Sequence, residues 1–288
     1  MIEQPAASPK QATKPQSILG DLGPRLLSAI VMVVAALGSL FAGGFVFTGF
    51  WLAAAVAIHW EWQRMTGGPS EKIRLYGGGL LIALVAGLAG LGAYDSALLL
   101  LMGGAVSLAL YQSGATRFWN AGGIFYAGAL VLAVVFLRNS TFLGIESILW
   151  LFAIVWGTDI MAYFGGRLIG GPKLCPRISP AKTWSGFIVG ISCGALLGLG
   201  VLWLRDVPLQ PVPFLLLGLF AGALAQGGDL FESFMKRRYG MKDSSRLIPG
   251  HGGVMDRLDG FIAAAVLAAL IGAQRGGPIA PGNGLFIW

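Results

Sequence analysis

Long apolar runs alternate with short turns along most of the chain, and only two of the segments between them are long and strongly polar. A helix needs about 20 mostly apolar residues to cross the hydrocarbon core of a bilayer. Runs close to this length predict membrane-spanning helices at residues 26–42, 44–62, 77–93, 95–112, 120–137, 145–166, 184–204, 212–231 and 258–274. We therefore predict an all-α, polytopic integral membrane protein with about nine transmembrane helices.

The stretches between these runs divide the chain into regions. Residues 1–24 are polar and rich in Pro and Gln and lack the apolar core of a signal peptide, which predicts a disordered cytoplasmic tail. Residues 25–118 form a first group of transmembrane helices, in which very short turns at Gly43-Gly44 and Tyr94-Asp95 predict two tight helical hairpins. Residues 119–288 form a second group with cytoplasmic loops at 167–183 and 232–257, where we expect the chemistry.

The composition agrees with a membrane protein and excludes several other classes. Charged residues make up 11% of the chain and hydrophobic residues 56%, whereas a soluble domain has about 25% charged residues. The net charge of +7 is scattered between apolar segments, which favours an anionic membrane surface or a phosphate substrate over nucleic acid. Cys175 and Cys193 have neither the spacing of a metal site nor that of a disulfide framework.

The distribution of Lys and Arg predicts the orientation, because cytoplasmic loops retain these residues. With the N-terminus inside, 17 of the 20 basic residues fall on the inner side. Only Arg138, Arg205 and Arg275 remain for the outer side. We therefore predict an N-in, C-out topology in which both polar loops face the cytoplasm.

Two carboxylates lie within or at the end of predicted spans. A lone charge facing lipid costs about 2.5–3.5 kcal/mol on insertion scales, so Asp159 and Asp229 must each face a polar interior or a partner. For Asp159, an ion pair that merely joins two helices is an equally good explanation. Asp229 shares one helix face with Glu232, Ser233 and Lys236, which favours a functional site.

The second polar segment has the composition of a phosphate-handling site. Magnesium is commonly bound by one or two carboxylates together with substrate phosphates, and we predict Asp229 and Asp256 as its ligands. Nucleotidyl transfer needs a metal ion, fixed cations and an aligned nucleophile. A phosphate nucleophile is already ionised, so we assign His251 a hydrogen-bonding or phosphate-contact role. The cations available to neutralise phosphate oxygens are Lys236, Arg237, Lys242, Arg246 and Arg257.

These residues form a long, specific motif that resembles the signature of the phosphatidate cytidylyltransferases. The motif is Ser233-Phe-Met-Lys236-Arg237, Lys242-Asp243, Pro249-Gly-His251-Gly-Gly253 and Asp256-Arg257-Leu-Asp259. An earlier block is similar to a second block of that family and reads Asp159-Ile-Met-Ala-Tyr163-Phe-Gly-Gly-Arg167, then Ser179-Pro180-Ala-Lys182-Thr183-Trp184. Ala181 and Ser185 stand where the family usually has Lys and Glu. The resemblance covers about residues 120–260.

The resemblance implies transfer of CMP from CTP to phosphatidic acid, with release of pyrophosphate, by a magnesium-dependent membrane enzyme. It also implies a homodimer in the inner membrane of a bacterium, with the site facing the cytoplasm, and it leaves room for a second cation. The expected metal ligands are Asp229 and Asp256, and the expected catalytic residues are Asp229, Asp256, Lys236, Lys242 and Arg257. The expected substrate-binding residues are Ser179, Lys182, Thr183, Ser233, Arg237, Arg246, His251 and Asp159.

Two other functions are compatible with parts of the pattern. The same chemistry could act on another lipid phosphate, such as an isoprenoid ether phosphate or a polyprenyl phosphate. Alternatively, Asp159 and Asp229 could mark the ion path of a transporter. Against transport, the charged residues gather at the inner face and the chain has no inverted repeat.

Overall fold

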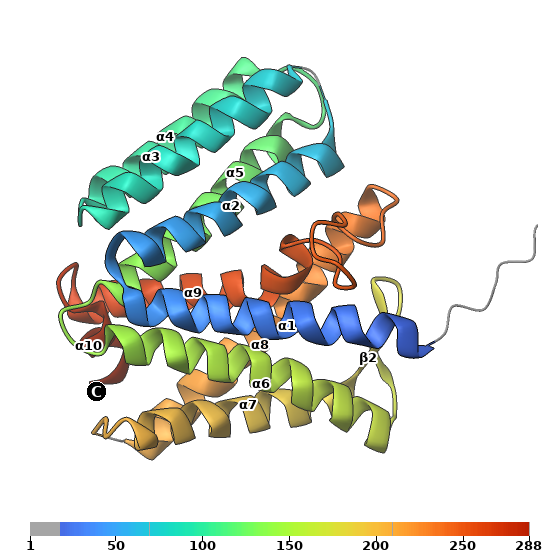
Figure 1. Ribbon diagram of the computed structural model, residues 1–288, viewed down its shortest axis with the longest axis vertical. Helices are drawn as coiled ribbons and strands as arrows, with labels where there is room; N and C mark the ends of the chain where they lie inside the picture. Colours follow the sequence, from blue (N-terminus) through green and yellow to red (C-terminus); the bar gives the residue numbers. More distant parts are fainter. Residues whose placement is uncertain (1–17, 69, 209, 288) are drawn as a thin grey trace, which may run out of the picture.

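A computed structural model describes residues 18–68, 70–208 and 210–287, and long helices dominate it (Figure 1). The helices are α1 (Ile18–Ala42), α2 (Gly44–Thr66), α3 (Gly78–Gly90), α4 (Tyr94–Tyr111), α5 (Arg117–Arg138), α6 (Gly144–Ile169), α7 (Trp184–Leu204), α8 (Pro211–Arg238), α9 (Met255–Gly276) and the short α10 (Pro281–Phe286). A π-helical turn, η1 (Ile73–Gly77), leads into α3, and β1 (Lys173–Cys175) pairs antiparallel with β2 (Ser179–Thr183). The predicted all-α, polytopic architecture is confirmed.

Within the described residues, eight helices are long and apolar enough to cross a membrane. They are α1, α2, η1 with α3, α4, α5, α6, α7 and α8. Helix α9, which coincides with the ninth predicted span, is not among these eight, and its first turns carry Asp256, Arg257 and Asp259. The count of nine spans and the N-in, C-out orientation therefore stay predictions.

Helices α6 and α7 pack closely because small residues line their interface. A Cβ added to Gly190 would lie 2.8 Å from the Thr158 carbonyl oxygen and 2.8 Å from the Ala162 Cβ. One at Gly198 would lie 2.7 Å from the Ile154 side chain. Glycines allow two membrane helices to approach in this way, and the close packing fixes the position of Asp159 on α6.

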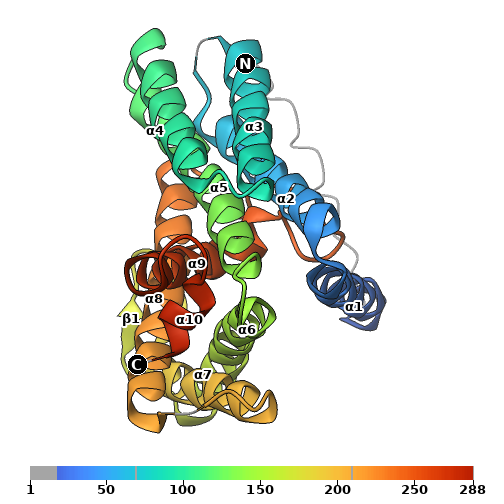
Figure 2. The ribbon, with the colours of Figure 1, turned by 90° about the vertical axis from the view of Figure 1, so that its left-hand side faces the viewer.

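The first two helices do not form the tight hairpin that their short connection predicts. The chain turns sharply at Gly43, whose φ of 64° suits glycine, and α2 then slants away from α1 (Figures 1 and 2). Helices α3 and α4 do lie side by side, as predicted (Figures 1 and 2). The divergence of α1 from α2 leaves a wedge, and residues of both helices line a large cavity there.

Both polar segments that were predicted as loops contain regular secondary structure. Helix α8 continues to Arg238, so residues 232–238 are helical and the second loop spans only 239–254. An i,i+4 ion pair between Glu232 and Lys236 supports this extension. The first segment contains the β1–β2 hairpin. Of the predicted N-terminal tail, residues 18–24 belong to α1, and residues 1–17 lie outside the described part of the chain.

The three basic residues expected on the outer side bind helix ends remote from the polar loops. Arg138 Nε donates to the Leu40 carbonyl oxygen at 2.9 Å, at the end of α1. Arg205 forms a 2.7 Å ion pair with Glu146, and Arg275 Nη1 donates to the Gly284 carbonyl oxygen at 3.0 Å. Cations near helix C-termini are favourable, as for Arg138 at the end of α1, and each of the three arginines has a local partner.

Candidate active site

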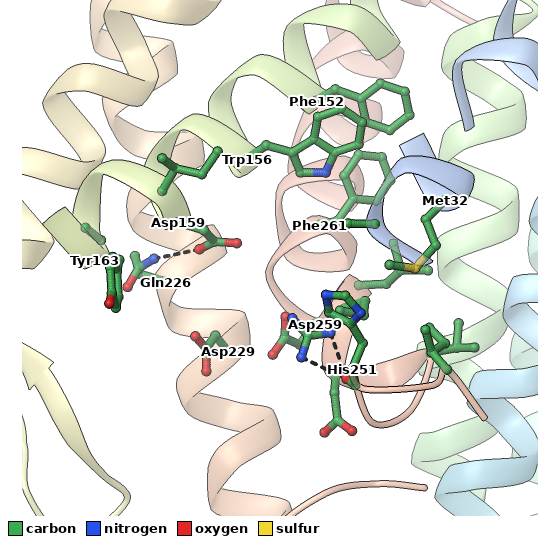
Figure 3. Close-up of a pocket in the computed structure, with 18 of the residues that line it drawn as sticks. Met32, Phe152, Trp156, Asp159, Tyr163, Gln226, Asp229, His251, Asp259 and Phe261 are labelled. Carbon is green, nitrogen blue, oxygen red and sulfur yellow. Dashed lines mark hydrogen bonds between the residues drawn. The ribbon is translucent and has the colours of Figure 1, made fainter. Parts of the chain in front are cut away.

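A cavity of about 1270 Å³ lies between α1, α2, α6, α8, α9 and the β hairpin. One side of it is apolar and includes Met32, Val33, Phe50, Trp51, Phe152, Trp156 and Phe261. The Trp51 and Phe261 rings are stacked, with centroids 5.0 Å apart. The other side carries charged and titratable residues, namely Asp159, Arg167, Lys173, Lys182, Asp229, Lys236, Asp243, His251, Asp256, Arg257 and Asp259. In Figure 3, Phe152, Trp156 and Phe261 lie above the carboxylates of Asp229 and Asp259.

A chain of polar contacts crosses the cavity wall from α6 to β2 and α8. Gln226 Nε2 donates to Asp159 Oδ1 at 3.1 Å, and Lys182 Nζ donates to Gln226 Oε1 at 2.8 Å. The same Lys182 ammonium lies 2.7 Å from Asp229 Oδ2. Sequence reasoning selected Lys182 and both aspartates but missed Gln226, which joins them. Asp159 therefore faces a hydrogen-bonded interior rather than lipid.

The β hairpin positions Lys182 beside Gln226 and Asp229, because the next residue, Thr183, is fixed at the start of α7. Thr183 is the N-cap of α7, where its hydroxyl oxygen accepts a hydrogen bond from the Gly186 amide at 3.1 Å. The cap anchors the end of β2 against α7. Lys182 then points toward α8, as its contacts with Gln226 and Asp229 show.

Asp256, in the first turn of α9, is surrounded by donors. Its Oδ1 accepts from Lys236 Nζ at 2.7 Å, and its Oδ2 accepts from the Gly253 amide at 2.8 Å and the Ser244 hydroxyl at 2.9 Å. The Ser244 amide also donates to it, at 3.0 Å from Oδ2. Three of these donors meet Oδ2, whereas Lys236 is the main donor to Oδ1. Asp256 thus orders the loop before α9.

Lys236 has two carboxylate partners within the described residues. Its ammonium lies 2.5 Å from Glu232 and 2.7 Å from Asp256. Only 13% of the Lys236 side chain and 1% of the Glu232 side chain are exposed. This buried cluster connects the end of α8 to the start of α9 and places Lys236 on the cavity wall.

His251 and Arg257 order the glycine-rich loop. Arg257 donates from Nε and Nη2 to the His251 carbonyl oxygen at 2.9 and 2.8 Å. The His251 ring lies 2.7 Å, from Nδ1 to Oγ, from Ser28 on α1. Partial burial, followed by the positive charge of Arg257, lowers the pKa of His251. The imidazole is therefore neutral at pH 7, and it connects this loop to α1.

The structure separates the predicted site residues into two groups. Eight of them line the cavity: Asp159, Lys182, Thr183, Asp229, Lys236, His251, Asp256 and Arg257. Five lie outside its lining: Ser179, Ser233, Arg237, Lys242 and Arg246. Arg237, Lys242 and Arg246 are exposed to solvent. Ser233 is next to the site, since its hydroxyl lies 3.3 Å from Asp229 Oδ1.

Three carboxylates of the site region were not selected from the sequence. Asp243 and Asp259 line the cavity, and their places in the motif were the available signal; Figure 3 shows Asp259. Glu61 on α2 is fully buried and contacts the loop before α9. The signal for Glu61 was an ionisable residue inside an apolar span, which is by default a functional candidate.

The carboxylates of the cavity and their hydrogen-bond partners show whether a magnesium ion fits the predicted site. In the described part of the chain, no three His, Cys, Asp or Glu side chains converge closely enough to enclose a metal ion. Asp229 receives one donor on each oxygen, so lone pairs remain for a cation. Asp256 is more crowded, because three donors meet its Oδ2 and Lys236 binds its Oδ1. Asp229 therefore fits a magnesium ion whose other ligands are substrate phosphates.

An apolar wall beside a floor of carboxylates and cations, in a helical membrane protein, is the arrangement expected of a membrane-embedded enzyme that acts on lipid phosphates. Comparison with known proteins identifies the family: residues 24–273 match the model of the cytidylyltransferase family. The chain is 42% identical over 269 residues to the phosphatidate cytidylyltransferase of Brucella suis biovar 1 (strain 1330), covering 91% of this chain and 97% of that protein.

Two further relatives carry the same name. The phosphatidate cytidylyltransferase of Haemophilus influenzae is 34% identical over 279 residues, covering 84% of this chain and 96% of that protein. That of Staphylococcus aureus (strain COL) is 44% identical over 119 residues, covering 41% and 46%. The protein described here therefore belongs to the cytidylyltransferase family, and the resemblance predicted from its motifs is confirmed.

Proposed function

We propose that this protein transfers CMP from CTP to phosphatidic acid and forms CDP-diacylglycerol and pyrophosphate. Proteins named phosphatidate cytidylyltransferase match nearly the whole chain. The structural observation that carries the proposal is the two-sided cavity, whose apolar wall comes mainly from α1, α2 and α6 and whose charged floor comes mainly from α8, α9, the loop between them and β2. Such a cavity accommodates a substrate that is half lipid and half phosphate together with a nucleotide.

The acyl part of phosphatidic acid would lie along the apolar wall, where α1 contributes Met32 and Val33 and α6 contributes Trp156. The phosphates of both substrates would lie over the charged floor. Lys182 and Arg257 line that floor, and fixed cations of this kind stabilise the charge that develops on transferring phosphoryl groups. The lipid phosphate would attack the α-phosphorus of CTP, forming a new P–O bond as the bond to the leaving pyrophosphate breaks.

Magnesium is part of the proposal. When bound, it would neutralise phosphate oxygens and polarise the phosphoryl group under attack. Asp229 would hold it together with substrate phosphates. Asp256 would join through Oδ1, where Lys236 is the main donor and has another carboxylate, Glu232, as a partner. Asp159 and Asp259 line the same cavity and would be available to a second cation.

The cellular setting is proposed on charge and family grounds. We place the protein in the inner membrane of a bacterium, N-in and C-out, with the site facing the cytoplasm, where CTP is made. The supporting observation is the gathering of basic residues on the polar loops beside the cavity. A homodimer remains a proposal from the family resemblance, to be checked by the mass of the purified protein in detergent.

The test of the reaction uses purified protein in detergent with Mg²⁺ and CTP, offered phosphatidic acid in one arm and a polyprenyl phosphate in the other. We expect CDP-diacylglycerol from phosphatidic acid only. Asp256→Asn should give no product, whereas Asp95→Asn, the same change at an exposed residue of α4, should behave like the wild type. Product from the polyprenyl phosphate alone would replace the proposed lipid, and no product from either lipid by folded protein would overturn the proposal.

A further inference from the structure

Glu61, in the N-terminal half of the chain, accepts hydrogen bonds from the loop before α9 and from the first residue of that helix. It lies in α2 and is fully buried. Oε1 accepts from the Ser245 hydroxyl at 2.6 Å and the Val254 amide at 2.9 Å. Oε2 accepts from the Met255 amide at 2.7 Å and lies 3.2 Å from the Ser244 hydroxyl. Three donors from residues 245–255 therefore bind this carboxylate, and the Ser244 hydroxyl lies within reach of it.

Two of these contacts cap a helix. The first amides of a helix have no partner within it, and α9 begins at Met255 after Val254, an N-cap residue without a side-chain hydrogen bond. Glu61 accepts from the amides of both residues. A negative charge at a helix N-terminus is also favourable. Helix α2 therefore provides the cap that the sequence of α9 lacks.

A single side chain, that of Ser244, lies between the carboxylates of Glu61 and Asp256. The Ser244 hydroxyl lies 3.2 Å from Glu61 Oε2 and 2.9 Å from Asp256 Oδ2, so it sits between the two carboxylates. A hydroxyl has one proton to donate, and the Met255 amide satisfies Glu61 Oε2 when Ser244 donates to Asp256. A Cβ at Gly253 would collide with both Ser244 and Glu61. Only glycine fits beside this contact.

We propose that Glu61 is a positioning residue for the transfer reaction. It holds residues 244–255 and the first turn of α9, and it thereby sets the orientation of Asp256 and the Gly253 amide at the cavity. This inference rests on the proposed function and gives a role in it to the N-terminal half. The competing explanation is that Glu61 only stabilises the fold.

The test compares Glu61→Gln with Glu146→Gln. The new glutamine in α2 keeps the shape of Glu61, but its amide nitrogen must face either the Val254 or the Met255 amide, so two donors meet. The control removes a carboxylate from a partly exposed ion pair with Arg205 at the far end of α6. Both variants are measured for kcat and KM with CTP, for melting temperature, and for cleavage by trypsin after Lys242 and Arg246, which are exposed and flank Ser244 and Ser245.

We expect Glu61→Gln to lower kcat about tenfold or more with a KM for CTP within about threefold of wild type, as for a lost interaction that acts mainly in the transition state. We expect trypsin to cleave the loop about tenfold faster below the melting temperature, because a local opening exposes it. Glu146→Gln should match the wild type in both measurements. Ser245→Ala, which removes one donor to Glu61, should shift both in the same direction by less.

Wild-type kcat and wild-type cleavage in Glu61→Gln would overturn the inference. So would a loss of activity that only follows the loss of folded protein, with unchanged cleavage below the melting temperature. If Glu61→Gln does not fold, Ser245→Ala decides by the same two measurements. If the wild type forms no CDP-diacylglycerol, the proposed function fails, while the cleavage rates still report whether Glu61 holds the loop.

Discussion

Lys182 Nζ lies 2.7 Å from Asp229 Oδ2 and thereby connects the β2 strand to the α8 helix at the charged side of the cavity. The two residues are 47 positions apart in the sequence, and each comes from a different polar segment. Their contact joins the two blocks of the family resemblance into one site. It also places a single cation next to the carboxylate best suited to bind a metal ion.

Replacing Lys182 by Met should lower kcat about 100-fold, since losing one preorganised group that stabilises transition-state charge has an effect of this size. Lys182→Arg keeps the charge and should retain more activity than Met. The matched control is Lys72→Met, at an exposed position before η1. Initial rates of CDP-diacylglycerol formation decide, and equal rates for Lys182→Met and the wild type would remove Lys182 from the site.

Replacing Gln226 by Leu should destabilise the protein by about 1–3 kcal/mol, because buried polar partners lose their hydrogen bonds. Asp159 loses the amide donor and Lys182 loses an acceptor. Chemical or thermal unfolding in detergent measures the change. Gln274→Leu, at an exposed position near the end of α9, is the comparison, and an equal effect of both substitutions would contradict the linking role of Gln226.

Chelation of divalent cations by EDTA should abolish activity, and added Mg²⁺ should restore it. Asp229→Asn should raise the Mg²⁺ concentration for half-maximal activity by about tenfold or more, because a neutral amide is a weaker ligand for a hard cation than a carboxylate. Activity titrated with Mg²⁺ gives this value for both proteins. Full activity in EDTA would refute the metal requirement, and an unchanged Mg²⁺ dependence would remove Asp229 from the metal site.

His251 should make the folded protein less stable at mildly acidic pH. Burial and Arg257 lower its pKa in the folded state, so the unfolded chain takes up a proton first as the pH falls below about 6.5. The stability associated with neutral His251 is therefore present above that pH and lost below it. Melting temperatures at pH 5.5 and 7.5 measure this loss, which should be smaller in His251→Asn; an equal loss in both proteins would contradict the prediction.

The apolar pattern predicted the helices closely, because in lipid a segment can satisfy its backbone hydrogen bonds only as a helix or in a closed barrel. Predicted spans 95–112 and 184–204 correspond to Tyr94–Tyr111 and Trp184–Leu204. The short α10 was missed, since six residues are too few for a periodic signal. The tight hairpin of α1 and α2 was wrong, because turn length limits how far helices can separate at the turn but not the angle between them.

The sequence by itself determined that this chain is a helical membrane protein and which family it resembles, and it selected Asp159, Lys182, Asp229 and Asp256 as candidate site residues. These conclusions follow from local properties, namely run length, charge and motif spacing. Only the tertiary structure decided which of these groups meet, through Gln226 and Ser244, and that Glu61 of α2 caps α9. Such contacts depend on how helices pack, and side-chain reach across a packed interface has no periodic trace in the sequence.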